Sequence, residues 1–119
     1  MLEHESVVMA GVGAGQLSLL FRRLHTMLEA GISLPDSLVY LEKGETDPEL
    51  HEVIQGCLSG ILRGQPLSAG MRKFPKTFSP LMIEMVASGE NTGSLASTLG
   101  HLASLTERQQ DRRQKVLSA

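Results

Sequence analysis

Residues 85–95 read Met-Val-Ala-Ser-Gly-Glu-Asn-Thr-Gly-Ser-Leu, and this stretch decides how the chain folds. An apolar helical run stops at Gly89, and a longer amphipathic run opens at Leu95. Because glycine readily adopts the backbone conformations that end helices, Gly89 and Gly93 predict a tight corner between two helices. Glu90 places one carboxylate at this corner, and we expect it to cap the N-terminus of the helix that follows.

In the rest of the chain, apolar residues recur at spacings of three and four, which indicates amphipathic helices. The expected helices cover residues 17–30, 34–42, 47–63, 67–74, 80–89 and a last one from 95 past 105. Ser33 and Asp47 are predicted N-caps, and Gly31 and Gly64 are predicted C-terminal caps. Because the connections are short, the sequence predicts an all-α fold, an antiparallel six-helix bundle.

The length of 119 residues suits one domain. We expect residues 1–15 to form a flexible leader and residues 16–119 to form a single helical domain. With 41% apolar residues but no tryptophan, the core must be largely aliphatic. Cys57 is the only cysteine and lies in the apolar stripe of the third helix, so it is predicted to be a small buried hydrophobe.

The segment Thr106–Lys115 is nearly all polar and contains neither glycine nor proline, so the last helix is predicted to run on past the bundle with an exposed outer end. It carries the local cations Arg108, Arg112, Arg113 and Lys115. Two interpretations stay open: a solvated helix end, or a membrane-proximal stretch that contacts lipid headgroups or a partner. No apolar run reaches the roughly 18 residues of a membrane span.

The residues that could hold a metal ion do not form a recognisable ligand set. The four histidines, which are expected on the surface, are His4, His25, His51 and His101. None has a paired spacing typical of metal ligands on one helix, so no metal or cofactor is expected. The acids around the second connection are Glu42, Glu45, Asp47, Glu49 and Glu52. Helix-dipole complementarity explains some of them, and a weak cation site is the alternative.

Single features of the sequence suggest two further functional hypotheses. A small all-α enzyme would pair Glu90 with a histidine such as His101 for acid–base chemistry. A helical nucleic-acid binder would use the terminal arginines, but the net charge of −2 and the pI near 6.1 argue against it.

Three patterns in a fixed order carry a resemblance to a known family. The first is FRRLHTMLEAGISLPDSL at residues 21–38, the second is GQPLSAGM at 64–71 followed by Phe74-Pro75 and Phe78, and the third is GENTGSL at 89–95. Together they resemble the cytoplasmic domain of the type II secretion F / type IV pilus C family, over about residues 16–119. Gly70 departs from the alanine or similar residue usual there, and an internal helical glycine weakens a helix by up to about 1 kcal/mol.

The resemblance implies a scaffold and no catalysis: the first cytoplasmic domain of a polytopic platform protein at the cytoplasmic face of the bacterial inner membrane. It implies docking of the secretion or pilus assembly ATPase and of inner-membrane partners, a homodimer, and no nucleic acid. The chain end at 112–116 is similar to the segment that leads into the first membrane span. The positions that match the family's signature residues are Gly31, Gly64, Gly89, Glu90 and Gly93.

Overall fold

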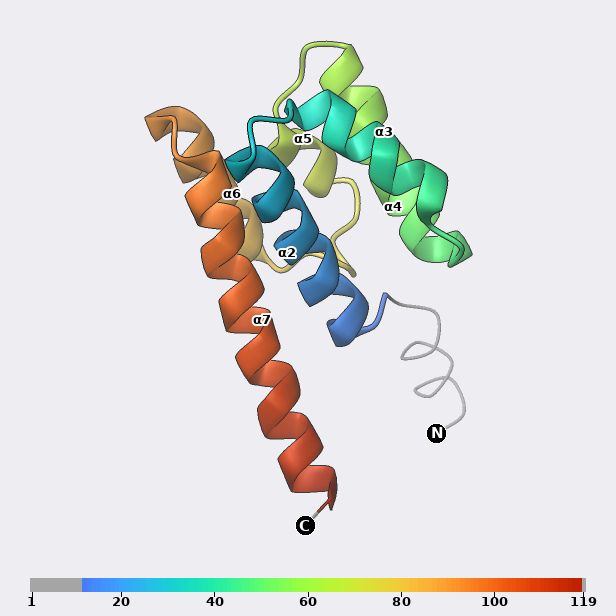
Figure 1. Cartoon of the computed structure of the whole chain (residues 1–119), viewed down its shortest axis with the longest axis vertical. Helices are drawn as coiled ribbons and strands as arrows, with labels where there is room; N and C mark the ends of the chain where they lie inside the picture. The colour runs from blue at the N-terminus through green and yellow to red at the C-terminus, as the bar shows by residue number, and fades with distance from the viewer. Residues whose placement is uncertain (1–11, 119) are drawn as a thin grey trace.

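The computed structural model describes residues 12–118, and it describes side chains as far as Arg112. Within residues 12–118 the fold is all-helical, with six helices and no strand (Figure 1). The helices are α2 (Ala14–Glu29), α3 (Leu34–Gly44), α4 (Pro48–Leu62), α5 (Leu67–Met71), α6 (Pro80–Thr92) and α7 (Leu95–Ser118). The predicted all-α bundle is confirmed.

The helices form a closed ring of contacts, in which each helix packs on its neighbours in sequence and α7 returns to α2. The α2–α7 pair is the most extensive of these contacts, and the α2–α3 pair is the least extensive. Figure 1 shows α2 and α7 side by side and antiparallel, while α3 and α4 form a hairpin beside the opposite face of α2. The bundle is therefore tightly closed at α7 and loosely closed at α3.

The predicted helix starts are confirmed by their capping geometry. The Ser33 hydroxyl accepts a hydrogen bond from the Asp36 amide at 3.2 Å, and the Asp47 carboxylate accepts one from the Leu50 amide at 2.9 Å. Each side chain satisfies one of the backbone amides that a helix leaves unpaired in its first turn. A proline in the first turn of α3 and of α4 fits the same rule, because the amide that it lacks would have no helical partner.

The corner between α6 and α7 differs from the prediction, because α6 does not stop at Gly89 but continues to Thr92. Gly93 ends it in the left-handed region, with φ +70°. Gly89 stays helical and buried because α7 approaches closely: a Cβ there would collide with the Thr98 hydroxyl oxygen and lie 3.0 Å from the Thr98 Cβ. The two glycines therefore serve different purposes, one for packing and one for the turn.

The core collects apolar side chains from every helix. Its largest fully buried members are Phe21, Leu38, Met71, Leu99, Leu102 and Val86. The rings of Phe21 and Phe78 lie 6.2 Å apart at 44°, a tilted aromatic pair. The apolar spacing predicts that Leu62 and Leu81 face the core, and this is wrong. Leu62 is 68% exposed at the end of α4, and Leu81 is 65% exposed at the start of α6.

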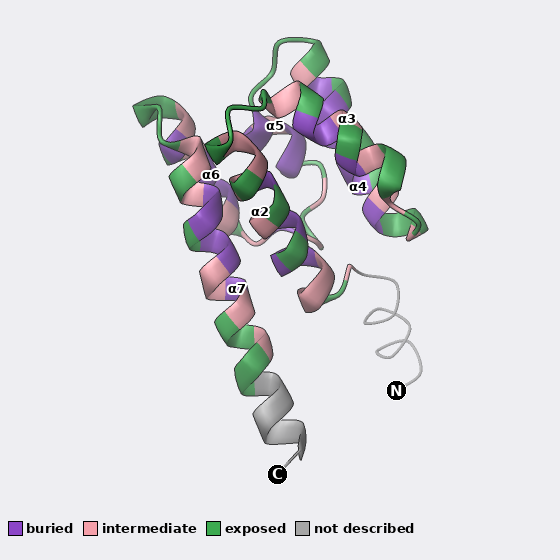
Figure 2. Ribbon diagram, in the orientation of Figure 1, coloured by how far each residue is buried: buried purple, intermediate pink, exposed green. Residues whose placement is uncertain are grey.

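Both ends of the predicted domain pack differently from expectation. α2 begins at Ala14, so the last two residues of the expected leader are helical, while residues 1–11 of that leader lie outside the described range. The polar segment of α7 is not exposed on all sides, since Thr106 is 4% exposed and its hydroxyl donates to the carbonyls of Leu102 and Ala103. Figure 2 shows exposed residues dominating α7 only beyond that point. No described helix combines the length and the apolar character that crossing a bilayer requires.

Candidate functional site

Glu90 does not cap α7, because it lies inside α6 and its carboxylate reaches across to α5. One oxygen accepts the Ser68 amide at 3.0 Å, and the other accepts the Ser68 hydroxyl at 2.6 Å. Ser68 is in the first turn of α5, and Pro66, its N-cap, supplies no capping side chain. Glu90 therefore replaces the missing local cap from 22 residues away, and the predicted role at α7 was wrong.

The remaining signature glycines shape turns. Gly31 has φ +90° after α2, and Gly64 has φ +88° after α4. Side chains other than glycine are strained there, so these positions fit the predicted C-terminal caps. Among the signature residues only Glu90 has a titratable side chain. Both of its hydrogen bonds among the described residues go to Ser68.

The packing of α5 against α4 leaves no room for a side chain at Gly70. A Cβ at Gly70 would lie 3.0 Å from the Cys57 Cα and 3.3 Å from its Sγ, so glycine permits α5 to pack directly on the backbone of α4. Cys57 is 3% exposed, as predicted, and burial raises the pKa of its thiol to about 12. A thiol held protonated in this way is a core side chain and not a nucleophile.

The structure does not bring together the pair of residues that an enzyme would need. Glu90 is tied to Ser68, whereas His101 lines a separate shallow hollow with Met85, Ser88, Ser97 and Thr98. No group of three or more His, Cys, Asp or Glu side chains that could hold a metal occurs in the described part of the chain. Two of the clustered acids have local structural roles: Glu45 accepts the Asp47 amide at 3.0 Å, and Asp47 caps α4.

The histidines are less uniform than predicted. His25 is only partly exposed, and its Nδ1–H donates to the Ala96 carbonyl oxygen at 2.7 Å, which ties α2 to α7. Gly100 makes room for this ring, since a Cβ there would lie 2.7 Å from two of its atoms. His51 lies 3.6 Å from the Glu42 carboxylate between α3 and α4. His4 lies outside the described residues. The sequence did not indicate that His25 would be an interhelical contact.

A charged contact missed at the sequence level closes the α2–α7 seam further along. The Arg22 guanidinium donates to both carboxylate oxygens of Glu107, at 2.9 and 3.1 Å, and to the Ser104 hydroxyl at 3.2 Å. The hydrogen-bonded arginine lowers the pKa of Glu107, and the same contact raises the pKa of Arg22. Glu107 therefore binds α7 to α2.

The basic stretch on α7 is only partly visible in the structure. Arg108 and Arg112 are exposed on α7, one turn apart as expected. The side chains of Arg113 and Lys115 lie outside the described residues, although their backbone is helical. The contact of this stretch with lipid headgroups or with a partner stays a prediction.

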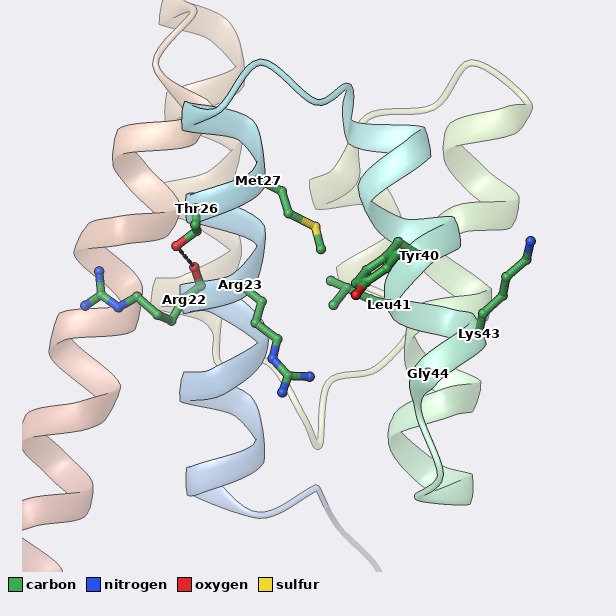
Figure 3. A pocket seen from close by; sticks show the side chains of 8 residues that line it. All are labelled: Arg22, Arg23, Thr26, Met27, Tyr40, Leu41, Lys43 and Gly44. Atoms are coloured by element: carbon green, nitrogen blue, oxygen red, sulfur yellow. Dashed lines mark hydrogen bonds between the residues drawn. The ribbon is translucent and has the colours of Figure 1, made fainter.

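A groove of about 620 Å³ lies between α2 and α3, where the ring of helices is loosest (Figure 3). The side chains around it that matter most are Arg23, Thr26 and Met27 on α2 and Tyr40, Leu41 and Lys43 on α3. In Figure 3, Met27, Tyr40 and Leu41 are directed into the gap between the helices, and Arg23 extends into its lower part. Its floor is therefore apolar and its edge is polar.

The charges around the groove are of one sign. The described lining residues include three cations and no carboxylate, although the whole chain has a net charge of −2. Arg22 is turned away towards α7 and engaged by Glu107 (Figure 3). Arg23 and Lys43 are exposed, and neither forms an ion pair with another residue of the described range. Among the residues whose side chains the structure describes, no carboxylate pairs with the exposed cations at this groove.

These features define a class of protein: an all-α helical domain with an open groove between two of its helices. Comparison with known proteins then gives the family. Residues 20–119 match the family model described as "Type II secretion system (T2SS), protein F". The chain is 31% identical over 106 residues to "Type II secretion system protein F" of Pseudomonas aeruginosa, covering 89% of this chain and 26% of that protein.

Proteins of pilus assembly are similar as well. "Type IV pilus assembly protein PilC" of Thermus thermophilus is 33% identical over 109 residues, covering 92% of this chain and 27% of that protein. "Type II secretion system protein F" of Aeromonas hydrophila is 31% identical over 109 residues, covering 92% of this chain and 28% of that protein. The chain belongs to the type II secretion system protein F family, and it spans about a quarter of the length of these relatives.

Proposed function

We propose that this chain is a non-catalytic scaffold domain at the cytoplasmic face of the bacterial inner membrane, in a platform protein of type II secretion or type IV pilus assembly. The domain docks the assembly ATPase and other inner-membrane assembly proteins. The observation that carries the proposal is the family match over residues 20–119, together with similarity to proteins of both systems.

The surface of the domain supports docking more than chemistry. Glu90, one of the pair that the sequence offered for acid–base chemistry, is hydrogen-bonded to Ser68, and Cys57 is buried in the core. The open features are instead the cationic groove and exposed apolar side chains such as Tyr40, which is 69% exposed. Exposed aromatic and arginine side chains are those that protein interfaces favour.

Self-association is part of the proposal. Leu62 and Leu81 expose apolar surface at the end of α4 and the start of α6, apart from the groove lining. We propose that such surface contributes to a homodimer, because large exposed apolar side chains gain from burial against a second copy. Sedimentation equilibrium should show a monomer–dimer equilibrium that Leu81→Asp shifts towards monomer.

The exposed cations of α7 give the domain its orientation in this proposal. Arg108 and Arg112 lie on one side of a helix that continues to Ser118, in the direction of the chain that would enter the membrane in a longer protein. Cations near the cytoplasmic leaflet are attracted to anionic headgroups, by about 1 kcal/mol each. Arg113 and Lys115 are proposed to extend the same stretch. Nucleic acid is not among the proposed partners.

Capture of the purified assembly ATPase on the immobilised chain tests the proposal. We expect saturable binding in the micromolar range of about 1–100 μM, as for transient contacts. A helical bundle of similar size and charge from an unrelated protein is the control. If neither the ATPase nor the soluble domains of its inner-membrane partners bind above that control, the docking function is wrong.

A further inference from the structure

We propose that the groove between α2 and α3 binds an acidic amphipathic helix of a protein partner, with apolar side chains of that helix on the groove floor and its carboxylates at Arg23. The inference rests on the proposed docking function and adds to it the place of docking and the chemistry of the partner. It is drawn from the shape, the exposed side chains and the charge of the groove.

The shape comes first. The groove holds about 620 Å³ between two neighbouring helices (Figure 3). Its floor combines Met27 with the buried Leu41, and methionine adapts to the shape of what it contacts. An apolar groove between helices is the surface into which an amphipathic helix places its apolar face.

Exposed side chains extend the apolar surface beyond the floor. Tyr40 is 69% exposed at the α3 edge, and Leu19 is 47% exposed one turn before Arg23 on the same face of α2. These are two of the five large apolar side chains that are exposed among the described residues. Tyr40 lines the groove, and Leu19 adds exposed apolar surface one turn beyond the lining residues of α2.

The charge selects the occupant. Every charged residue that lines the groove is a cation, and the one that Figure 3 shows reaching into the gap, Arg23, has no ion-pair partner in residues 12–112. Lys43 adds a second exposed cation at the α3 rim, although Figure 3 shows its side chain extending away from α2. A guanidinium offers paired N–H groups that match a carboxylate, so an acidic helix is favoured over a basic one. Like charge at this edge would repel a basic partner.

The protein carries its own reporter for the test, because Tyr40 is the only tyrosine and there is no tryptophan. The probe is a synthetic helical peptide of roughly 15 residues without aromatic side chains, with leucines on one face and glutamates beside them. Titrating it into the full chain should change the tyrosine fluorescence saturably. A second peptide with lysine in place of every glutamate should bind at least about tenfold more weakly.

Arg23→Glu is the decisive variant, because it reverses the charge without touching the core. It should invert the preference between the two peptides, whereas Arg72→Glu, at an exposed cation outside the groove lining, should leave it unchanged. Equal binding of both peptides, no binding, or an unchanged preference in Arg23→Glu would overturn the inference. So would a concentration-dependent fluorescence change without peptide that persists in Leu81→Asp, which would indicate a second copy in the groove, or displacement of the acidic peptide by phosphatidylserine vesicles.

Capture of the ATPase and of the inner-membrane partner domains by the same variant separates this inference from the proposed function. If the wild-type chain captures a partner and Arg23→Glu loses most of that capture, both stand. If Arg23→Glu captures every partner as the wild type does, the groove is not the docking site and the inference fails, while the docking function survives. If the wild-type chain captures none of them, the docking function itself fails.

Discussion

Along its α7 side, helix α2 is closed by hydrogen bonds and close backbone contacts, whereas along its α3 side it borders an open groove. Arg22 and Arg23 make the contrast sharpest, because they are consecutive in sequence. Arg22 is held by Glu107 and Ser104 in the seam, and Arg23 projects into the groove without an ion-pair partner in the described range. One helix thus supplies both the stability of the domain and its free surface, and the two can be altered separately.

Truncating a leucine on either side should give the largest difference. Leu99 is fully buried and lies beside Leu24 of α2 around the same interior space, while Leu19 is 47% exposed. Leu99→Ala should lower the free energy of unfolding by about 2–5 kcal/mol, because it leaves a cavity. Leu19→Ala should change it by no more than about 0.5 kcal/mol. Urea unfolding followed by circular dichroism measures both, and equal losses would erase the contrast.

Glu90 extends the comparison to a charged side chain that is engaged inside the fold. Glu90→Ala leaves the Ser68 amide and hydroxyl without their acceptor, which should cost about 1–2 kcal/mol, as for a lost helix cap. Adding Ser68→Ala should cost less in the Glu90→Ala background than in the wild type, because the two residues share one interaction. Strictly additive losses in thermal or urea unfolding would show that the contact does not stabilise α5.

The close approach of α2 and α7 at His25 should give a smaller effect. Gly100→Ala places a methyl group 2.7 Å from the imidazole, so the ring must move away from the Ala96 carbonyl, at a cost of about 1 kcal/mol. In a His25→Ala background, Gly100→Ala should be neutral or stabilising, since alanine favours the helix. Thermal unfolding of the four proteins in this cycle gives the result. A cost that persists without the imidazole would place the strain elsewhere.

The ion pair of the seam should give the smallest effect and a pH signature. The pKa of Glu107 is lowered in the folded state, so the stabilisation is fully present above the unfolded value of about 4.3 and is lost as the pH falls through the folded value. The Tm difference between the wild type and Glu107→Gln should therefore be present at neutral pH and vanish in acid. Arg23→Gln should show no comparable pH-dependent difference. A difference for Glu107→Gln that grows in acid would contradict the assignment.

Features set by near neighbours in sequence were predictable. Ser33 and Asp47 cap the helices that follow them, and the apolar spacing placed the start of all six described helices to within a few residues. These signals depend on hydrogen bonds and spacings within one turn, which the sequence displays directly. The left-handed glycines at Gly31 and Gly93 belong to the same category.

Features set by distant neighbours were not predictable. Glu90 and Ser68 are 22 residues apart, and Arg22 and Glu107 are 85 residues apart, so no local pattern links either pair. Gly89 appeared to be a helix stop because a glycine required by close packing and a glycine required by a turn look the same in sequence. The sequence did not indicate the groove, because its apolar residues follow the same helical spacing as the residues of the core.

We propose that Arg22 serves the fold and that Arg23 serves a partner. The most direct test measures thermal unfolding together with capture of the ATPase and of the inner-membrane partner domains, for Arg22→Glu and Arg23→Glu. We predict that Arg22→Glu lowers Tm, because it opposes Glu107 with a like charge, and that Arg23→Glu keeps the wild-type Tm and loses capture of a partner that the wild type binds. An Arg23→Glu variant that melts like Arg22→Glu, or that captures every partner like the wild type, would contradict this division of roles.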